Sequence, residues 1–511
     1  MKRDKRKERA RDEQRNAVLV AALTCIGIGA VVATGMGSQS EPASPSAPSG
    51  GTQESSGRVA PASVALESCT LPGVSEPARC GSLEVPENPD LPEGRRISIA
   101  IAVLPATSGK ALADPIVPLP GGPAEDIIGV AAYFVERLAP LRDARDILLV
   151  DQRGAGRSSA LRCDLYSPVE AAENLRQWFV PASLERCARE LRQRADLTQY
   201  GYLRFIDDLE GVRQALGYSQ LNLFAGSYGT RAAQVYVRAH PKSVRTVLFG
   251  SVVPIDEIAP LTMAKAGERA RELMFSACDA DAACRAAYPN LREEFRQVAA
   301  RLESGVRVSI AGVGDELPLD RGRVAEWFRS KLYRPSSATI LPWAIHRAYG
   351  GDWNPIAEDI LVGARERDRA YSFGLFFAIT CSDDVAFIRE DDIAPNVKDT
   401  FLGDFRVRQQ QAACRYWPRA PLPRGFREPV RSPVPALFVS GDADAAGPLW
   451  ITDQAARGFS NRAEVVMRNR GHTEWNECVG RLYARFVRDA SPRGLDATSC
   501  PAESWPPFRT N

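Results

Sequence analysis

The chain has 511 residues, of which 44% are hydrophobic and 25% are charged. A chain of this length forms either one large domain with an insertion or two domains. Its 65 basic and 63 acidic residues leave a net charge of +2, so no overall field attracts nucleic acid or an acidic polymer.

Residues 1–37 have the pattern of an export signal or membrane anchor. Basic and acidic side chains in residues 2–15 precede an uncharged, mostly apolar run at 17–36. A basic start before such a run is typical of an export signal. Because the run is long enough to span a bilayer, two alternatives remain: a cleaved signal, or an anchor at 17–36 that is the chain's only contact with the membrane. Either one leaves the rest of the chain outside the cytoplasm, in the cell envelope or secreted.

Residues 38–66 are rich in serine, proline and glycine. They show neither helical nor strand periodicity and cannot bury a core. We therefore predict a disordered linker between the export signal and the folded part of the chain.

Ten cysteines follow the apolar run, and an even number in an exported chain indicates a disulfide framework. None lies in a cluster with zinc-binding spacing, so we expect neither a metal nor another cofactor. The alternative is that some are buried free thiols. Pairing neighbours in order predicts the bridges Cys69–Cys80, Cys163–Cys187, Cys278–Cys284, Cys381–Cys414 and Cys478–Cys500.

Residues 67–254 alternate between strand and helix patterns. The segment 96–104 alternates like a strand, 146–150 ends in the apolar run of a buried parallel strand, and 203–216 has helical spacing. Such alternation predicts an α/β fold with a doubly wound, mostly parallel sheet.

Residues 255–424 read as successive helices with scarcely a strand. Strand patterns return at 434–440 and 463–467, within residues 425–511. We therefore predict a mainly helical cap at 255–424, inserted between the first part of the sheet domain and its C-terminal part.

Ser227 lies in the clearest motif of the chain. A strand pattern at 221–224 runs through Ala225 and Gly226 to the serine, and a helical pattern begins at Tyr228. A serine on such a sharp turn is a nucleophile elbow, usually written G-x-S-x-G, with Ala225 here in place of the first glycine.

The partners of a nucleophilic serine follow the last two predicted strands. Asp442 and Asp444 come after the first of them, and His472 comes after the second. The order serine, acid, histidine is that of an α/β-hydrolase catalytic triad. His472 is therefore the predicted base, either aspartate can supply the acid, and the two other histidines, His240 and His346, read as structural.

An oxyanion hole needs two backbone N–H donors. The N–H of Tyr228 at the head of the elbow helix is one candidate. The other comes from the loop after the 114–119 strand, where Pro123 has no N–H. Gly122 is the predicted donor, with Gly121 as the alternative.

Five motifs in this order resemble those of the proline iminopeptidase and tripeptidyl aminopeptidase group of serine peptidases, over roughly residues 67–505. The motifs are PGGPA at 120–124, DQRGAGRS at 151–158, AGSYGT at 225–230, SGDADAAGP at 440–448 and GHTEW at 471–475. The resemblance implies the α/β-hydrolase fold, with Asp444 as the acid and Gly122 and Tyr228 as the oxyanion donors. The chain departs from the usual residues of the group at Pro120, Ala124 and Ala225, which bears on substrate preference more than on catalysis.

An aminopeptidase must hold the positive amino group of its substrate, and a carboxylate in a poorly solvated place near the triad does this best. The resemblance includes a C-x-D element, matched by Cys381-Ser382-Asp383 directly after an apolar run. Asp383 is the first candidate and Asp384 the second. The alternative is that these aspartates cap the following helix.

We therefore expect an exported serine aminopeptidase that removes short units from the free N-terminus of peptides through an acyl-enzyme on Ser227. One alternative is an exported carboxylesterase or acyltransferase, because the same triad cleaves esters and fold does not fix function. A more remote alternative is a catalytically idle binding protein. The presence of all three triad residues and both oxyanion positions argues against that last alternative.

Overall fold

The computed structural model describes residues 64–496, 498 and 500–511. The predicted export signal or anchor at 1–37 and residues 38–63 of the predicted linker lie outside the described residues. Within the described part of the chain, none of the helices combines the length and the hydropathy of a membrane span.

A nine-stranded sheet forms the centre of the described part, in the order β1-β2-β3-β5-β4-β6-β7-β10-β11. The strands are β1 (Glu67–Cys69), β2 (Ala78–Pro86), β3 (Arg96–Leu104), β4 (Ile116–Leu119), β5 (Ile147–Val150), β6 (Leu221–Gly226), β7 (Val244–Gly250), β10 (Ala436–Gly441) and β11 (Arg462–Met467). Neighbours from β1 to β5 pair antiparallel, and those from β5 to β11 pair parallel. The predicted α/β fold with a mostly parallel sheet is confirmed.

Alternate residues of the central strands enter different hydrophobic cores. On β5, Leu148 and Val150 pack on one face while Ile147 and Leu149 pack on the other. One face is covered by α4 (Tyr202–Ala215) and α5 (Gly229–Ala239), and the other by α2 (Ala131–Leu138) and α17 (Glu477–Asp489). Helix α3 (Pro181–Arg194) packs farther out, against α13 (Phe373–Asp383) and α15 (Phe405–Ala413) of the segment that follows β7. Both faces of the inner parallel strands β4, β5, β6 and β10 are therefore buried, which explains why these strands read as mostly continuous apolar runs.

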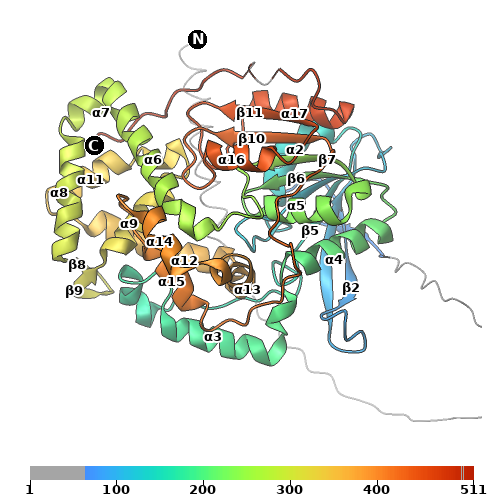
Figure 1. The fold of residues 1–511 in the computed structure, drawn as a ribbon, viewed down its shortest axis with the longest axis horizontal. Helices are drawn as coiled ribbons and strands as arrows, with labels where there is room; N and C mark the ends of the chain where they lie inside the picture. The colour runs from blue at the N-terminus through green and yellow to red at the C-terminus, as the bar shows by residue number, and fades with distance from the viewer. Residues whose placement is uncertain (1–63, 497, 499) are drawn as a thin grey trace, which may run out of the picture. The chain divides into compact units, whose positions relative to one another are not determined.

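The chain between β7 and β10 is mainly helical and gathers to one side of the sheet (Figure 1). Its helices are α6 (Ala259–Ala280), α7 (Ala282–Ala287), α8 (Leu291–Ser304), α9 (Arg321–Lys331), α10 (Pro335–Ala338), α11 (Leu341–Tyr349), α12 (Asn354–Ala370), α13 (Phe373–Asp383), α14 (Glu390–Val397) and α15 (Phe405–Ala413). Most of them share a core of their own, whereas α13 packs its phenylalanines into the core of the sheet. The described chain resumes the sheet at β10, followed by α16 (Leu449–Ala456).

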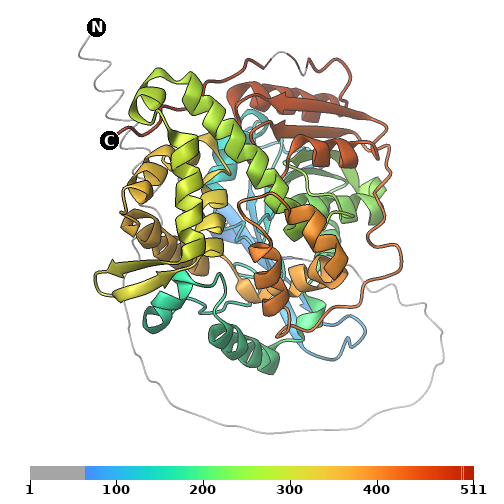
Figure 2. The ribbon, with the colours of Figure 1, turned by 60° about the vertical axis from the view of Figure 1, so that its left-hand side comes forward.

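One hairpin interrupts the helical segment. Strands β8 (Val306–Ile310) and β9 (Gly314–Leu319) pair antiparallel, and in Figures 1 and 2 they lie at the edge of the helices, away from the sheet. The sequence analysis predicted scarcely a strand within residues 255–424. The hairpin is short and mostly exposed, with Val308, Ile310 and Leu319 directed into the core of the helices, so its periodicity spans too few residues to stand out.

The structure contains five disulfides, and all five predicted pairs are confirmed: Cys69–Cys80, Cys163–Cys187, Cys278–Cys284, Cys381–Cys414 and Cys478–Cys500. Disulfides form and persist in oxidising compartments. The framework therefore indicates an extracytoplasmic location.

The two bridges of the helical segment should contribute unequally to stability. Cys381–Cys414 closes a separation of 33 residues and Cys278–Cys284 one of 6, while all four cysteines are buried. The chain-entropy model gives a loss of about 4 kcal/mol for the first bridge and about 2 kcal/mol for the second. Denaturant unfolding of the two double serine variants measures the difference. A larger loss for Cys278→Ser/Cys284→Ser would contradict this expectation.

Candidate active site

Ser227 occupies the turn between β6 and α5, near the middle of the sheet. Its backbone lies in the left-handed region at φ 53°, and its N–H donates to the Gly250 carbonyl at 2.9 Å. A Cβ on Gly229 would come within 2.6 Å of the Leu119 carbonyl oxygen, so the second glycine of the motif is required sterically. Ala225, by contrast, lies in β6 with its methyl group buried in the core. That position therefore accepts alanine.

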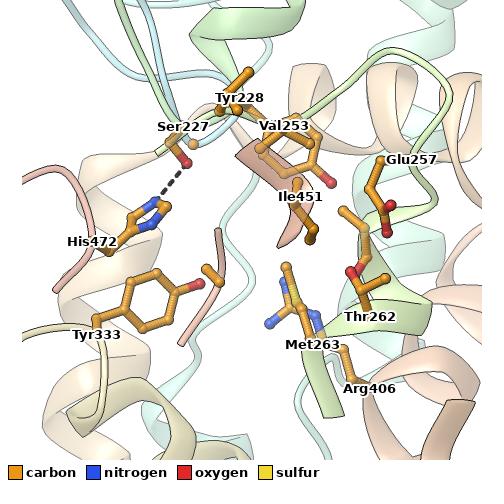
Figure 3. A pocket seen from close by; sticks show the side chains of 14 residues that line it. Ser227, Tyr228, Val253, Glu257, Thr262, Met263, Tyr333, Arg406, Ile451 and His472 are labelled. Atoms are coloured by element: carbon orange, nitrogen blue, oxygen red, sulfur yellow. Dashed lines mark hydrogen bonds between the residues drawn. The ribbon is translucent and has the colours of Figure 1, made fainter. Parts of the chain in front are cut away.

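Ser227, His472 and Asp444 form one chain of hydrogen bonds. His472 Nε2 lies 2.8 Å from Ser227 Oγ, and its Nδ1 lies 3.0 and 2.9 Å from the two carboxylate oxygens of Asp444. Figure 3 shows the serine and the imidazole facing each other at one side of a pocket. The structure thus brings together the three side chains that the sequence analysis named, which follow β6, β10 and β11.

The two candidate acids have different environments. Asp444 is fully buried and accepts hydrogen bonds from the N–H groups of Ala446 and Gly447 at 2.7 and 2.8 Å. Burial acts to raise the pKa of its carboxyl, but His472 and these N–H groups outweigh burial and hold the pKa below its ordinary value. Asp442 instead accepts from the Asn469 N–H and faces Arg468, and it has no bond to His472.

Tyr333 supports the loop that carries His472. The backbone N–H of His472 donates to the Tyr333 carbonyl at 2.6 Å, and the two rings meet edge to face with centroids 5.0 Å apart. Tyr333 follows α9 in the helical segment. The sequence analysis missed this residue, because no local pattern predicts which distant carbonyl meets the histidine.

Gly122 and Tyr228 flank the pocket beside Ser227. Strand β4 pairs with β6 so that Leu119 lies opposite Ala225, which brings the glycine loop next to the elbow. The Gly121 N–H donates to Glu125 at 3.0 Å, whereas no hydrogen bond of the Gly122 or Tyr228 N–H is seen among the described residues. A Cβ on Gly122, which has φ 101°, would come within 2.7 Å of the Tyr371 ring. Of the two glycines, Gly122 therefore has the N–H that is available to a substrate.

The pocket next to Ser227 has apolar and charged walls (Figure 3). Val252, Val253, Met263 and Ile451 supply apolar surface. Its remaining lining residues are Gly122, Ser227, Tyr228, Glu257, Ala259, Thr262, Tyr333, Arg406, Ala446 and His472.

The structure does not bring Asp383 and Asp384 into this pocket. Asp384 is 0% exposed and accepts from Arg231, from the Tyr228 hydroxyl and from the Ala259 N–H. Asp383 is 2% exposed, and its burial raises the pKa of its carboxyl to about 7. The alternative that these aspartates cap the next helix also fails, because Asp384 makes no side-chain capping bond there. Asp384 instead holds Arg231 and the hydroxyl of Tyr228, a residue that lines the pocket.

Glu257 is the carboxylate that lines the pocket, and the sequence analysis missed it. It lies in the loop between β7 and α6, and burial raises the pKa of its carboxyl. Active sites of parallel α/β sheets lie at the carboxyl ends of the strands. The acids Asp256 and Glu257, soon after the β7 strand pattern, were therefore the available signal.

Two family models match the chain: alpha/beta hydrolase fold at residues 114–276 and TAP-like protein at 399–500. The serine protease Hip1 of Mycobacterium tuberculosis is 30% identical over 40% of this chain and 42% of its own length. The tripeptidyl aminopeptidase of Streptomyces lividans is 28% identical over 38% of this chain and 39% of its own. The match thus spans less than half the length of each of these relatives.

Among solved structures, the proline iminopeptidase of Mycobacterium smegmatis is 16% identical in sequence. The superposition covers 80% of this chain and 98% of that one, with a TM-score of 0.40.

Proposed function

Because the chain has the α/β-hydrolase fold and resembles the proline iminopeptidase and tripeptidyl aminopeptidase group of serine peptidases, we propose that it is a serine aminopeptidase that acts outside the cytoplasm. It removes short units from the free N-terminus of peptides. One observation carries the proposal: the hydrogen-bonded chain of Ser227, His472 and Asp444 opens into a pocket that also holds the carboxylate of Glu257.

In this proposal Ser227 Oγ attacks the carbonyl carbon of the scissile bond while His472 Nε2 takes its proton. The N–H groups of Gly122 and Tyr228 stabilise the negative charge that develops on the carbonyl oxygen. His472 then gives the proton to the leaving amine, and an acyl-enzyme remains on Ser227. Water, deprotonated by His472, hydrolyses it.

Asp444 acts through His472. Its carboxylate holds the imidazole with the proton on Nδ1, so that Nε2 is free to accept the proton of the serine. The lowered pKa of Asp444 supports this role, because the group stays ionised and stabilises the imidazolium that forms during attack.

Glu257 is the proposed partner of the substrate's amino group. An ammonium group attracts a carboxylate strongly where water screens the pair little, and Glu257 is partly buried beside apolar side chains. Burial raises the pKa of Glu257, so a bound cation also restores the charged form that burial disfavours.

Glu257→Gln should remove the preference for a free amino group. We expect the ratio of kcat/KM for a free peptide to that for its N-acetylated form to fall about tenfold or more, mainly through KM, since a hydrogen bond to a charged group is lost. Because burial raises the pKa of Glu257, the same ratio in the unsubstituted protein should fall as the pH drops through that raised value. Taking the ratio removes the separate effect of protonating His472.

The matched control is Asp256→Asn, which changes the neighbouring acid that accepts a bond from Gln454 and does not line the pocket. It should leave the ratio unchanged. Equal cleavage of free and acetylated peptides by the unsubstituted protein would sink the aminopeptidase proposal and favour the carboxylesterase or an endopeptidase. Failure to react with a serine-directed phosphonate would favour an idle binding protein.

A further inference from the structure

Arg406 places a guanidinium group in the wall of the pocket that holds Ser227. The residue lies on α15 and is 7% exposed, and the amine-binding proposal leaves it without a role. In Figure 3 its side chain enters from the side of the pocket away from Ser227 and His472.

The guanidinium is held rigidly on its protein side. Nη1 donates to Glu326 Oε1 at 2.6 Å, Nε donates to Gln410 Oε1 at 3.1 Å, and the group stacks 3.6 Å above the Trp178 ring. The second terminal nitrogen, Nη2, has no hydrogen-bond partner among the described residues. A cation fixed on one side, with donors left over toward a cavity, is arranged to receive an acceptor.

The surroundings of Arg406 carry more positive than negative charge. Glu326 bonds Arg329 at 2.6 and 3.1 Å as well as Arg406, so one carboxylate serves two guanidinium groups. Two further guanidinium groups, those of Arg323 and Arg367, lie close enough to act on this cluster electrostatically, and Asp320 acts on Arg323 with the opposite sign. The four guanidinium groups therefore face two carboxylates, those of Glu326 and Asp320. Arg329 Nη1 is buried and has no hydrogen-bond partner within the described part of the chain.

This excess of charge is costly in a buried place unless an anion offsets it. Burial and the neighbouring Arg367 lower the pKa of Arg323 to about 9. Glu326 cannot supply more compensation, because Arg329 and Arg406 already hold its pKa at about 2 despite its burial. Arg406 is the member of this cluster that lines the pocket.

We propose that Arg406 forms an anion subsite that binds a carboxylate of the substrate. The inference rests on the proposed function, because it assumes that the pocket beside Ser227 receives a substrate. The pocket then carries both signs of charge, with Glu257 for the amino group and Arg406 for a carboxylate. Two sources share this chemistry: an acidic side chain near the scissile bond and the C-terminal carboxylate of a short peptide.

Two substrate comparisons distinguish the sources. The first compares C-terminally amidated peptides that differ only by Glu against Gln, or Asp against Asn, on either side of the scissile bond. The second compares one neutral peptide with a free and with an amidated C-terminus. We expect one of the carboxylate forms to have a kcat/KM about tenfold higher, mostly through a lower KM, as one charged hydrogen bond provides. If neither comparison shows a higher kcat/KM for the carboxylate form, the proposed subsite is wrong.

Variants of α15 provide the matched test. Arg406→Gln should bring the ratio of kcat/KM for the carboxylate substrate to that for the amide close to one. Arg406→Lys should keep part of the preference for the carboxylate, because the point charge of an ammonium group replaces the two-pronged guanidinium group. Arg408→Gln is the control, since Arg408 lies on the same helix, is half exposed and pairs with Glu390 and Asp404. An unchanged ratio in a folded Arg406→Gln variant, judged by its thermal unfolding, also overturns the proposal.

Inhibition of the unsubstituted protein keeps the test decisive if Arg406→Gln does not fold. Glutarate should inhibit competitively at a concentration about tenfold lower than glutaramide. Equal inhibition by the two, or none, counts against the subsite.

The subsite and the peptidase activity can fail separately. If no peptide is cleaved, the 4-nitrophenyl monoester of glutarate can be compared with that of its half-amide as an ester substrate. A higher kcat/KM for the carboxylate ester, after the uncatalysed hydrolysis of each ester is subtracted, would then support the anion subsite while refuting the peptidase. Cleavage of peptides without any preference for a carboxylate would support the peptidase and refute the anion subsite.

Discussion

Replacing Ser227 with alanine should leave less than about a thousandth of the normal turnover, and His472→Ala should do the same. The two atoms that exchange the proton lie 2.8 Å apart, and neither has a substitute within reach among the described residues. The measurement is kcat on a peptide or ester substrate with folding checked by circular dichroism.

The losses of kcat caused by Ser227→Ala and His472→Ala should not multiply in the double variant. The residues act as a unit, so the double variant should be about as slow as either single variant. His346→Ala is the control, because His346 is half exposed and pairs with Glu294 in the helical segment, away from the pocket. Normal turnover in Ser227→Ala would show that Ser227 is not the nucleophile.

Asp444→Asn should be the second most damaging change, with a loss on the order of 10⁴-fold in kcat, because an amide favours the wrong tautomer of the histidine. The bonds from His472 Nδ1 and from the Ala446 and Gly447 N–H groups all converge on this carboxylate. Steady-state kinetics of the folded variant, at the pH optimum of the unsubstituted protein, gives the comparison.

Asp442→Asn provides the matched control two residues away. It removes a half-buried carboxylate that accepts from the Asn469 N–H and faces Arg468 but makes no bond to His472, so we expect a loss below about tenfold. If Asp442→Asn proves the more damaging of the two, the assignment of the acid is wrong.

The parts of the site that sequence analysis predicted are those with a local signature. Ser227 follows an apolar strand and precedes a helix, so the residues next to it in the sequence predict the turn. Asp444 and His472 follow β10 and β11, and parallel strands bring their carboxyl ends to one edge of the sheet. The five disulfides join cysteines that are neighbours in order along the chain, so a local rule was sufficient for them as well.

The parts that could not be predicted depend on packing between distant segments. Asp383 ends an apolar helix, and only the packing of α13 into the core of the sheet shows that its carboxylate is buried outside the pocket. Arg406 looks in the sequence like one of many surface arginines, because its burial depends on Glu326 and Trp178 from elsewhere in the chain. Tyr333 contributes a carbonyl, a group that every residue has.

The bond from the His472 N–H to the Tyr333 carbonyl limits how the protein can move during a catalytic cycle. Many hydrolases admit substrate by swinging a lid aside. Here such a swing of α9 and its successor loop would take Tyr333 away and release the backbone that aims the imidazole at Ser227. We therefore expect the helices around Tyr333 to stay in place during the catalytic cycle and not to move as a lid. The size of a permanent entrance then limits which peptides are cleaved.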